Sequence, residues 1–208
     1  MASEPGTTQR VWDLPVRLMH WGLALSVLGA WLTRELEGDW FAWHVRFGYA
    51  VLLIVTTRIV WGFVGTRYAR FKDFVRGPRA ILALLGLLLT QSVLGLFAND
   101  QVLEAGPLYG YVEGATSDRL TTLHKQLFDL IVVAIAIHVG AALYYLWVRR
   151  ENLIRPMITG RKPGSSLPAG AEGVSRSRTL LAIAILAVTG ALLWWVVATA
   201  PEASLFAF

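Results

Sequence analysis

Long apolar runs separated by short polar segments dominate the sequence. A helix needs about 20 predominantly apolar residues to cross the hydrocarbon core of a bilayer, and five runs come close to or exceed that length. These runs cover residues 15–32, 41–64, 81–98, 122–148 and 179–199. The segments between them are too short to fold as soluble domains. The pattern therefore predicts an all-α integral membrane protein with five transmembrane helices.

The charged residues of the connecting segments alternate in sign along the chain. Acidic residues outnumber basic ones after the first and third predicted helices, whereas basic residues outnumber acidic ones after the second and fourth. Loops rich in Lys and Arg stay on the cytoplasmic side of a membrane. This rule predicts a cytoplasmic N-terminus and a C-terminus on the opposite side, as five crossings require.

Composition supports the membrane assignment. Apolar residues make up 55% of the chain, charged residues only 16%, and the mean hydropathy is +0.53. Most of the nine Trp lie near the ends of the predicted helices, as in the aromatic belts of membrane proteins. A net charge of +5 does not indicate nucleic-acid binding, because the positive residues lie between apolar runs. The absence of Cys excludes disulfides, Cys-ligated iron–sulfur clusters and covalently attached c-type haem.

All four histidines lie within or at the edge of predicted helices: His20, His44, His124 and His138. Ionisable residues at membrane depth indicate function, although each could instead bond a neighbouring helix. His124 and His138 are 14 residues apart, almost four helical turns, so their rings share one face about 21 Å apart along the axis. The predicted topology pairs His44 with His124 near the outer surface and His20 with His138 towards the cytoplasm. Each pair could ligate one iron from both faces of a porphyrin, and without Cys a b-type haem is expected.

Two arginines are candidate haem-binding residues. Arg58 follows His44 by 14 residues and so shares its face, at the depth of the inner histidine pair. A haem propionate would stabilise a buried guanidinium, and snorkelling to the membrane surface is the alternative. Arg17, one turn before His20, is a candidate of the same kind.

Two glycines repeat the same offset, one turn after His44 and after Arg58. Gly48 and Gly62 would let a flat ring approach the backbone, and close helix packing is the alternative. Gln91 is the most notable polar residue of the third predicted helix. It could bond a neighbouring helix or contact a quinone.

Several motifs together resemble a known family. They are VWDLPVRLMHW at 11–21, the run from His44 through Gly48 to Arg58, WGFVGTRYARF at 61–71, and RENLIRPMITGRK at 150–162. Over about residues 11–162 the chain resembles the superfamily of bacterial cytochrome b561 and the b-type cytochromes of nickel–iron hydrogenases. The resemblance implies a four-helix bundle in the bacterial inner membrane that holds two haems b through the same four histidines.

The chain is predicted to have three parts. Residues 1–162 would form the di-haem membrane domain, 163–178 a flexible linker rich in Gly, Pro and Ser, and 179–208 a fifth transmembrane helix with a short periplasmic tail. The fifth helix is additional to the family's four, and it has no His or charged residue. It is therefore expected to be an anchor or a packing helix. Relatives also usually have a longer stretch between the Arg-Gly-Pro at 76–78 and the third helix.

The resemblance implies a function in electron transfer. Relatives pass electrons between a quinone, ubiquinone or menaquinone, and a redox partner outside the cytoplasm, such as a c-type cytochrome or a hydrogenase. The acidic outer loops favour docking of a basic partner. One alternative is a self-sufficient superoxide:ubiquinone oxidoreductase, although an acidic outer face does not attract an anion. Another is a haem-free membrane scaffold or transporter. An electron-carrier subunit is favoured over a stand-alone enzyme, and the oligomeric state stays open.

Overall fold

The computed structural model describes residues 8–34, 36, 39–73, 78–100, 104–163, 173–174 and 177–201. Most of the predicted linker, the tail beyond residue 201 and the segment 74–77 before the third helix lie outside these ranges. The described chain is mostly helical, with one small two-stranded sheet.

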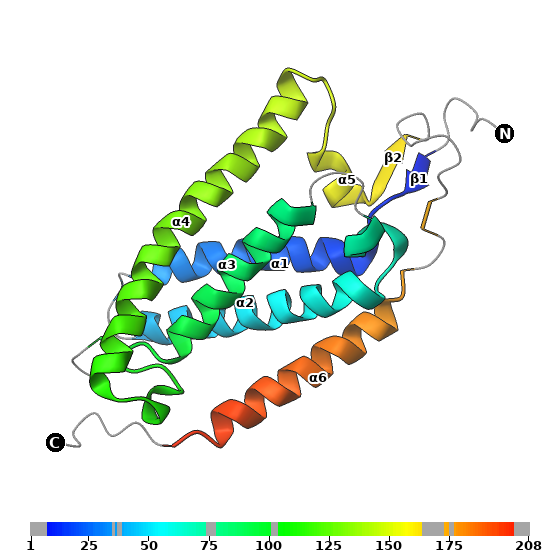
Figure 1. Cartoon of the computed structure of the whole chain (residues 1–208). Helices are drawn as coiled ribbons and strands as arrows, with labels where there is room; N and C mark the ends of the chain where they lie inside the picture. The colour runs from blue at the N-terminus through cyan, green and yellow to red at the C-terminus, as the bar shows by residue number, and fades with distance from the viewer. Residues whose placement is uncertain are drawn as a thin grey trace.

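Five long helices correspond to the five predicted apolar runs (Figure 1). They are α1 (Leu14–Thr33), α2 (Asp39–Val64), α3 (Pro78–Leu96), α4 (Gly114–Trp147) and α6 (Thr179–Ala198). Two 3₁₀ turns, η1 (Arg67–Ala69) and η2 (Phe71–Asp73), follow α2, and a third, η3 (Tyr109–Tyr111), precedes α4. We call the end where α1 begins the inner end, and the end where α4 begins the outer end.

Three of the described helices are long and apolar enough to cross a membrane: Trp40–Val64, Gly114–Trp147 and Thr179–Ala198. The apolar part of α3, Ile81–Leu96, is shorter. The chain is therefore an integral membrane protein by helix length and composition. The predicted arrangement of four membrane-spanning helices with an additional fifth one remains a prediction.

The fourth helix begins at Gly114, earlier than the predicted start at residue 122. Its first turns are polar, so hydropathy alone does not mark them. They are held by the segment after α3, because the Ser117 hydroxyl donates to the Phe97 carbonyl at 2.6 Å and the Asn99 backbone N–H donates to the Thr121 hydroxyl at 3.0 Å. Partners from elsewhere in the chain thus extend the helix beyond its apolar part.

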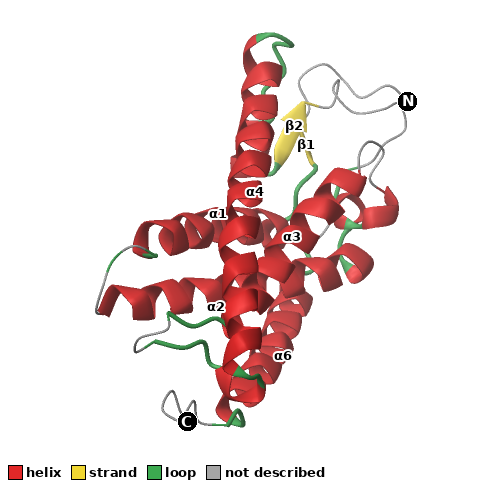
Figure 2. Ribbon diagram, turned by 60° about the vertical axis from the view of Figure 1, so that its left-hand side comes forward, coloured by secondary structure: helices red, strands yellow, loops and turns green. Residues whose placement is uncertain are grey.

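The core of the bundle joins three helices at mid-height. Val51 and Val55 of α2 pack against Leu85 and Leu88 of α3 and against Ile131 of α4. Neighbouring helices pack in the order α1, α2, α3, α4, with α6 on the outside of α2. The close packing of α4 is with α3, and its contacts with α1 and α2 are sparse. Both views show α4 as the longest helix, extending past the others (Figures 1 and 2).

A small cap at the inner end connects the start of the chain to the segment after α4. Strand β1 (Thr8–Arg10) pairs with β2 (Arg161–Pro163) in antiparallel fashion, beside the short helix α5 (Ile154–Thr159). Gly160 ends α5 with φ of 79°, a conformation that favours glycine, and its carbonyl accepts from the backbone N–H of Val11 at 2.8 Å. The sequence does not predict this cap, because three-residue strands carry too little pattern to detect.

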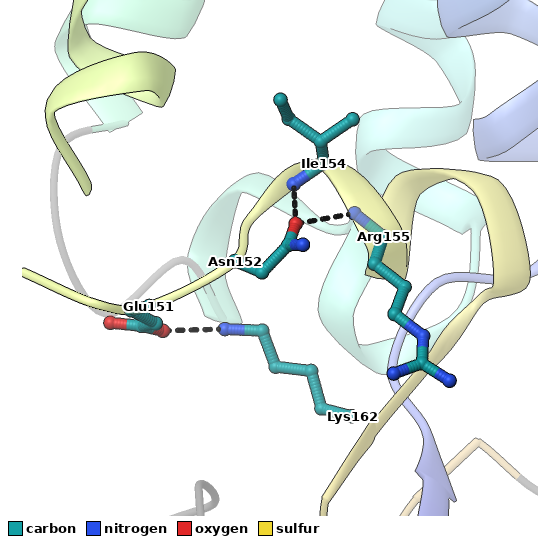
Figure 3. Close-up of polar contacts among 5 residues, drawn as sticks. All are labelled: Glu151, Asn152, Ile154, Arg155 and Lys162. Atoms are coloured by element: carbon teal, nitrogen blue, oxygen red, sulfur yellow. Dashed lines mark hydrogen bonds and ion pairs between the residues drawn. The ribbon is translucent and has the colours of Figure 1, made fainter. Parts of the chain in front are cut away.

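Side chains on either side of α5 stabilise the cap (Figure 3). The Asn152 side-chain oxygen accepts from the backbone N–H groups of Ile154 and Arg155, at 3.0 and 2.9 Å, which satisfies the first turn of α5. Lys162 forms an ion pair with Glu151 at 3.0 Å. The RENLIRPMITGRK motif is therefore the sequence of a folded cap.

The fifth long helix, α6, is attached to the bundle at three heights. At the inner end the Arg178 guanidinium donates to the Val64 carbonyl at 3.1 Å. At mid-height the Thr57 and Thr189 hydroxyls are 3.2 Å apart, and at the outer end the Tyr111 hydroxyl donates to the Thr199 carbonyl at 3.4 Å. The helix expected to be an anchor or packing helix is thus bonded to α2 at the inner end and at mid-height, and to η3 at the outer end.

A buried carboxylate connects the start of α1 to the end of α2. Asp13 is fully buried and caps α1, because one carboxylate oxygen accepts from the Val16 N–H at 2.8 Å. The other accepts from the Thr66 hydroxyl at 2.6 Å. The motif residue Asp13 therefore has a structural role, which the sequence pattern alone does not indicate.

Replacing Asp13 by Ala should lower the free energy of unfolding by about 2–3 kcal/mol, since the helix cap is lost and the buried Thr66 hydroxyl loses its acceptor. Thermal unfolding in detergent measures the change. Thr122→Ala is the control, because among the described residues that exposed hydroxyl bonds only its own helix, to the Asp118 carbonyl. Equal melting temperatures for the two variants would contradict this role for Asp13.

Candidate functional site

The four histidines form two pairs between facing helices. The ring centres of His44 on α2 and His124 on α4 are 6.3 Å apart. Those of His20 on α1 and His138 on α4 are 6.2 Å apart. His138 is exposed, whereas the other three are partly buried. α4 therefore contributes one ring to each pair, 14 residues apart, as its sequence spacing requires.

Backbone carbonyls hold both rings of the outer pair. His44 Nδ1 is 2.8 Å from the Ala30 carbonyl oxygen, and His124 Nδ1 is 2.9 Å from the Gln91 carbonyl oxygen. A carbonyl only accepts, so each Nδ1 carries the proton and each Nε2 keeps its lone pair. Such bonds set the tautomer of histidines that ligate metals and raise their basicity.

The separation within each pair suits a metal between the two rings. A metal–imidazole bond is about 2.0–2.1 Å long and a ring nitrogen lies about 1 Å from the ring centre, so two axial imidazoles on one metal have centres about 6 Å apart. The observed separations of 6.2 and 6.3 Å agree with that estimate. The Gln91 side chain also lies at this position, with its nitrogen 3.2 Å from His124 Nε2. That amide must move aside before Nε2 can bind a metal.

The two histidine levels are separated by the apolar core. Ile131 lies midway between His124 and His138 in sequence, and it is 1% exposed. Val51, midway between His44 and Arg58, packs in the same cluster. The sparse packing of α4 against α1 and α2 leaves the facing helices connected mainly through this layer and the paired rings.

Arg58 is partly buried in α2, with its guanidinium carbon 5.4 Å from the centre of the Phe71 ring. Its Nη1 is buried and has no hydrogen-bond partner among the described residues. The Asp13 carboxylate attracts this guanidinium, but its two oxygens already accept from the Val16 N–H and the Thr66 hydroxyl. A buried donor without a hydrogen bond is costly, so Nη1 is suited to a further anion. The arrangement does not resemble snorkelling, in which the charged head reaches water.

Arg17 connects α1 to the inner cap. One guanidinium nitrogen donates to the Ile158 carbonyl, while Nε is buried without a hydrogen-bond partner among the described residues. Arg17 therefore has a structural role in holding α5 against α1, and its Nε remains available to donate a hydrogen bond.

The two candidate glycines differ in their surroundings. A Cβ added at Gly48 would meet nothing within 4 Å, so this position leaves open space beside α2, as the approach of a flat ring requires. A Cβ added at Gly62 would lie 2.1 Å from the Phe71 ring, so at that position close packing of Phe71 fills the space. The alternative of close packing thus describes Gly62.

The comparison with protein-family models decides the family. A model described as prokaryotic cytochrome b561 matches residues 11–160, most of the chain. The chain belongs to the prokaryotic cytochrome b561 family. It is therefore a membrane b-type cytochrome of an electron-transfer family that binds b-type haem. No curated protein and no solved structure matches it.

The side chains present in this cytochrome fit a b-type haem held by two histidines. Two neutral imidazoles keep lone pairs on Nε2 in the outer pair, and both pairs have the ring separation of axial ligands. Gly48 leaves open space, and Arg58 offers an unpaired donor of the charge that propionates require.

Sequence reasoning did not find what holds the outer rings. Gln91 is predicted to bond a neighbouring helix or contact a quinone, and it does contact α4, but the sequence does not show that its backbone carbonyl holds His124, 33 residues away. Gly95, whose missing side chain faces the His124 ring, was not singled out. The sequence signal that could have indicated this contact is Gly95, which follows the polar residue Gln91 by one turn on an otherwise apolar helix.

Proposed function

We propose that this cytochrome holds two b-type haems, one between His44 and His124 and one between His20 and His138. It would carry electrons across the bacterial inner membrane between a quinone, ubiquinone or menaquinone, and a redox partner on the periplasmic side. The observation that supports this most strongly is the separation of both ring pairs, 6.3 and 6.2 Å, between facing helices. Each bound haem would supply reversible one-electron chemistry.

Different residues of the chain would have different roles at these two sites. The histidines supply axial nitrogens, and the Ala30 and Gln91 carbonyls orient the outer two. Arg58, with Arg17 as a second cation, would pair with propionates at the inner site. The apolar layer around Ile131 keeps water from the space between the two levels, and a low dielectric strengthens every charge interaction there.

The proposed orientation places the N-terminus in the cytoplasm and the C-terminus in the periplasm. Acidic residues outnumber basic ones in the segment 104–121, which would then face the periplasm. Such a surface attracts a basic partner by long-range electrostatics, which supports a c-type cytochrome or a hydrogenase subunit with a basic face.

The test is the haem content and redox spectrum of the purified full-length protein. We expect two haems b per chain and a reduced-minus-oxidised difference spectrum of low-spin b-type haem. A pyridine haemochrome assay with protein quantification measures the ratio. One haem per chain would contradict the pairing scheme, and a high-spin spectrum would contradict ligation by two histidines.

A further inference from the structure

Gly95 of α3 faces the ring of His124. A Cβ built at Gly95 would lie 3.0 Å from Cε1 of this ring, closer than such atoms ordinarily approach, and 3.4 Å from Nδ1, in van der Waals contact. A methyl group at position 95 would therefore push the ring away from α3 by a few tenths of an ångström.

The same face of α3 supplies the acceptor for this ring. Gln91 lies one turn before Gly95, and its carbonyl oxygen is 2.9 Å from His124 Nδ1. A helical carbonyl has a second lone pair, so it can accept this bond in addition to its bond within the helix. The His124 ring contacts the Gln91 carbonyl from beside Gly95. A residue other than glycine at position 95 would place its Cβ against this ring. The absence of a side chain at Gly95 thus lets the ring lie at the short distance observed for the Nδ1–H bond.

We propose that Gly95 is a positioning residue for His124, which admits the ring to the Gln91 carbonyl and so sets how strongly this histidine donates electrons to its metal. The proposal rests on the proposed function, because it takes His124 as an axial ligand. A hydrogen bond from Nδ1–H raises the basicity of a ligating imidazole. A more basic ligand favours the oxidised metal, so a longer bond favours the reduced metal.

The chain offers a matched control on the same helix. Gly86 also lies in α3, but a Cβ added there would meet nothing within 4 Å. The substitutions Gly95→Ala and Gly86→Ala therefore make the same chemical change on one helix, but only the first contacts His124. The second haem, at His20 and His138, serves as an internal control in both variants.

The experiment is a potentiometric titration of the full-length protein, with electron paramagnetic resonance of the oxidised haems. In Gly95→Ala we expect the outer haem's reduction equilibrium to shift towards the reduced form by on the order of tenfold, about 59 mV for one electron. Its resonance signal should shift as well, while the inner haem and the Gly86→Ala protein keep wild-type values. Identical outer-haem potentials in the two variants would overturn the proposal.

A second measurement covers the case in which Gly95→Ala fails to assemble. Electron–nuclear double resonance on the wild-type protein detects the exchangeable Nδ1 proton of each axial histidine. The proposal requires a hydrogen-bonded Nδ1 proton on the ligand that disappears in His124→Ala, and a proton without a hydrogen bond there would overturn it. Failure of the proposed function is distinct, because wild-type protein would then lack two haems with paired histidine ligands.

Discussion

Replacing His124 by Ala should remove one haem b from the protein and leave the other bound. The ring of His124 lies 6.3 Å from that of His44, centre to centre, and His138 on the same helix is paired with His20 instead. Loss of one of two axial ligands removes most of the affinity of a buried haem site. The haem-to-protein ratio should therefore fall from two to about one, and the pyridine haemochrome assay measures it.

The other histidines provide the controls. His44→Ala should leave the same spectral component as His124→Ala, whereas His20→Ala and His138→Ala should both leave the other component. Residual spectra that differ between His44→Ala and His124→Ala would show that the pairs are assigned wrongly. Normal haem content in all four variants would instead show that these histidines do not ligate the haem.

Replacing Arg58 by Gln should lower the reduction potential of the inner haem, or its retention, and leave the outer haem nearly unchanged. The buried Nη1 of Arg58 has no partner among the described residues, and a propionate would provide one. Loss of a positive charge near the metal stabilises its oxidised form. A unit charge about 10 Å away at an effective dielectric of about 20 contributes about 1–2 kcal/mol. Potentiometric titration resolves the two components.

Arg46→Gln is the matched control for this charge change. Arg46 lies on the same helix, but it is exposed and its guanidinium stacks on Trp43, with 4.8 Å between the guanidinium carbon and the ring centre. We expect no shift in either haem for this variant. Equal shifts in both haems for Arg58→Gln, or none, would mean that the arginine acts only on packing or at the membrane surface.

The sequence by itself determined the features that repeat along a single helix. Hydropathy located the five long helices, because each contains a continuous apolar run. Helical geometry placed His124 and His138 on one face, since 14 residues make nearly four turns. Alternating loop charge and helix direction then suggested which histidines share a depth. None of these inferences required knowledge of how two helices rotate relative to each other.

The tertiary structure decided the contacts that depend on that rotation. The Ala30 and Gln91 carbonyls that hold the outer rings belong to other turns and other helices than the rings themselves, and so does Gly95, which admits His124. Gly48 and Gly62 share one sequence pattern, yet only Gly48 has open space, because Phe71 folds back over Gly62.

The ends of the helices show the same limit. Hydropathy placed the start of the fourth helix at residue 122, but Phe97 and Asn99 hold its polar first turns and extend it to Gly114. The inner cap arises because Gly160 meets Val11, about 150 residues away in sequence. Local pattern reports which face of a helix is apolar, whereas these contacts depend on how side chains from distant segments fill the space between helices.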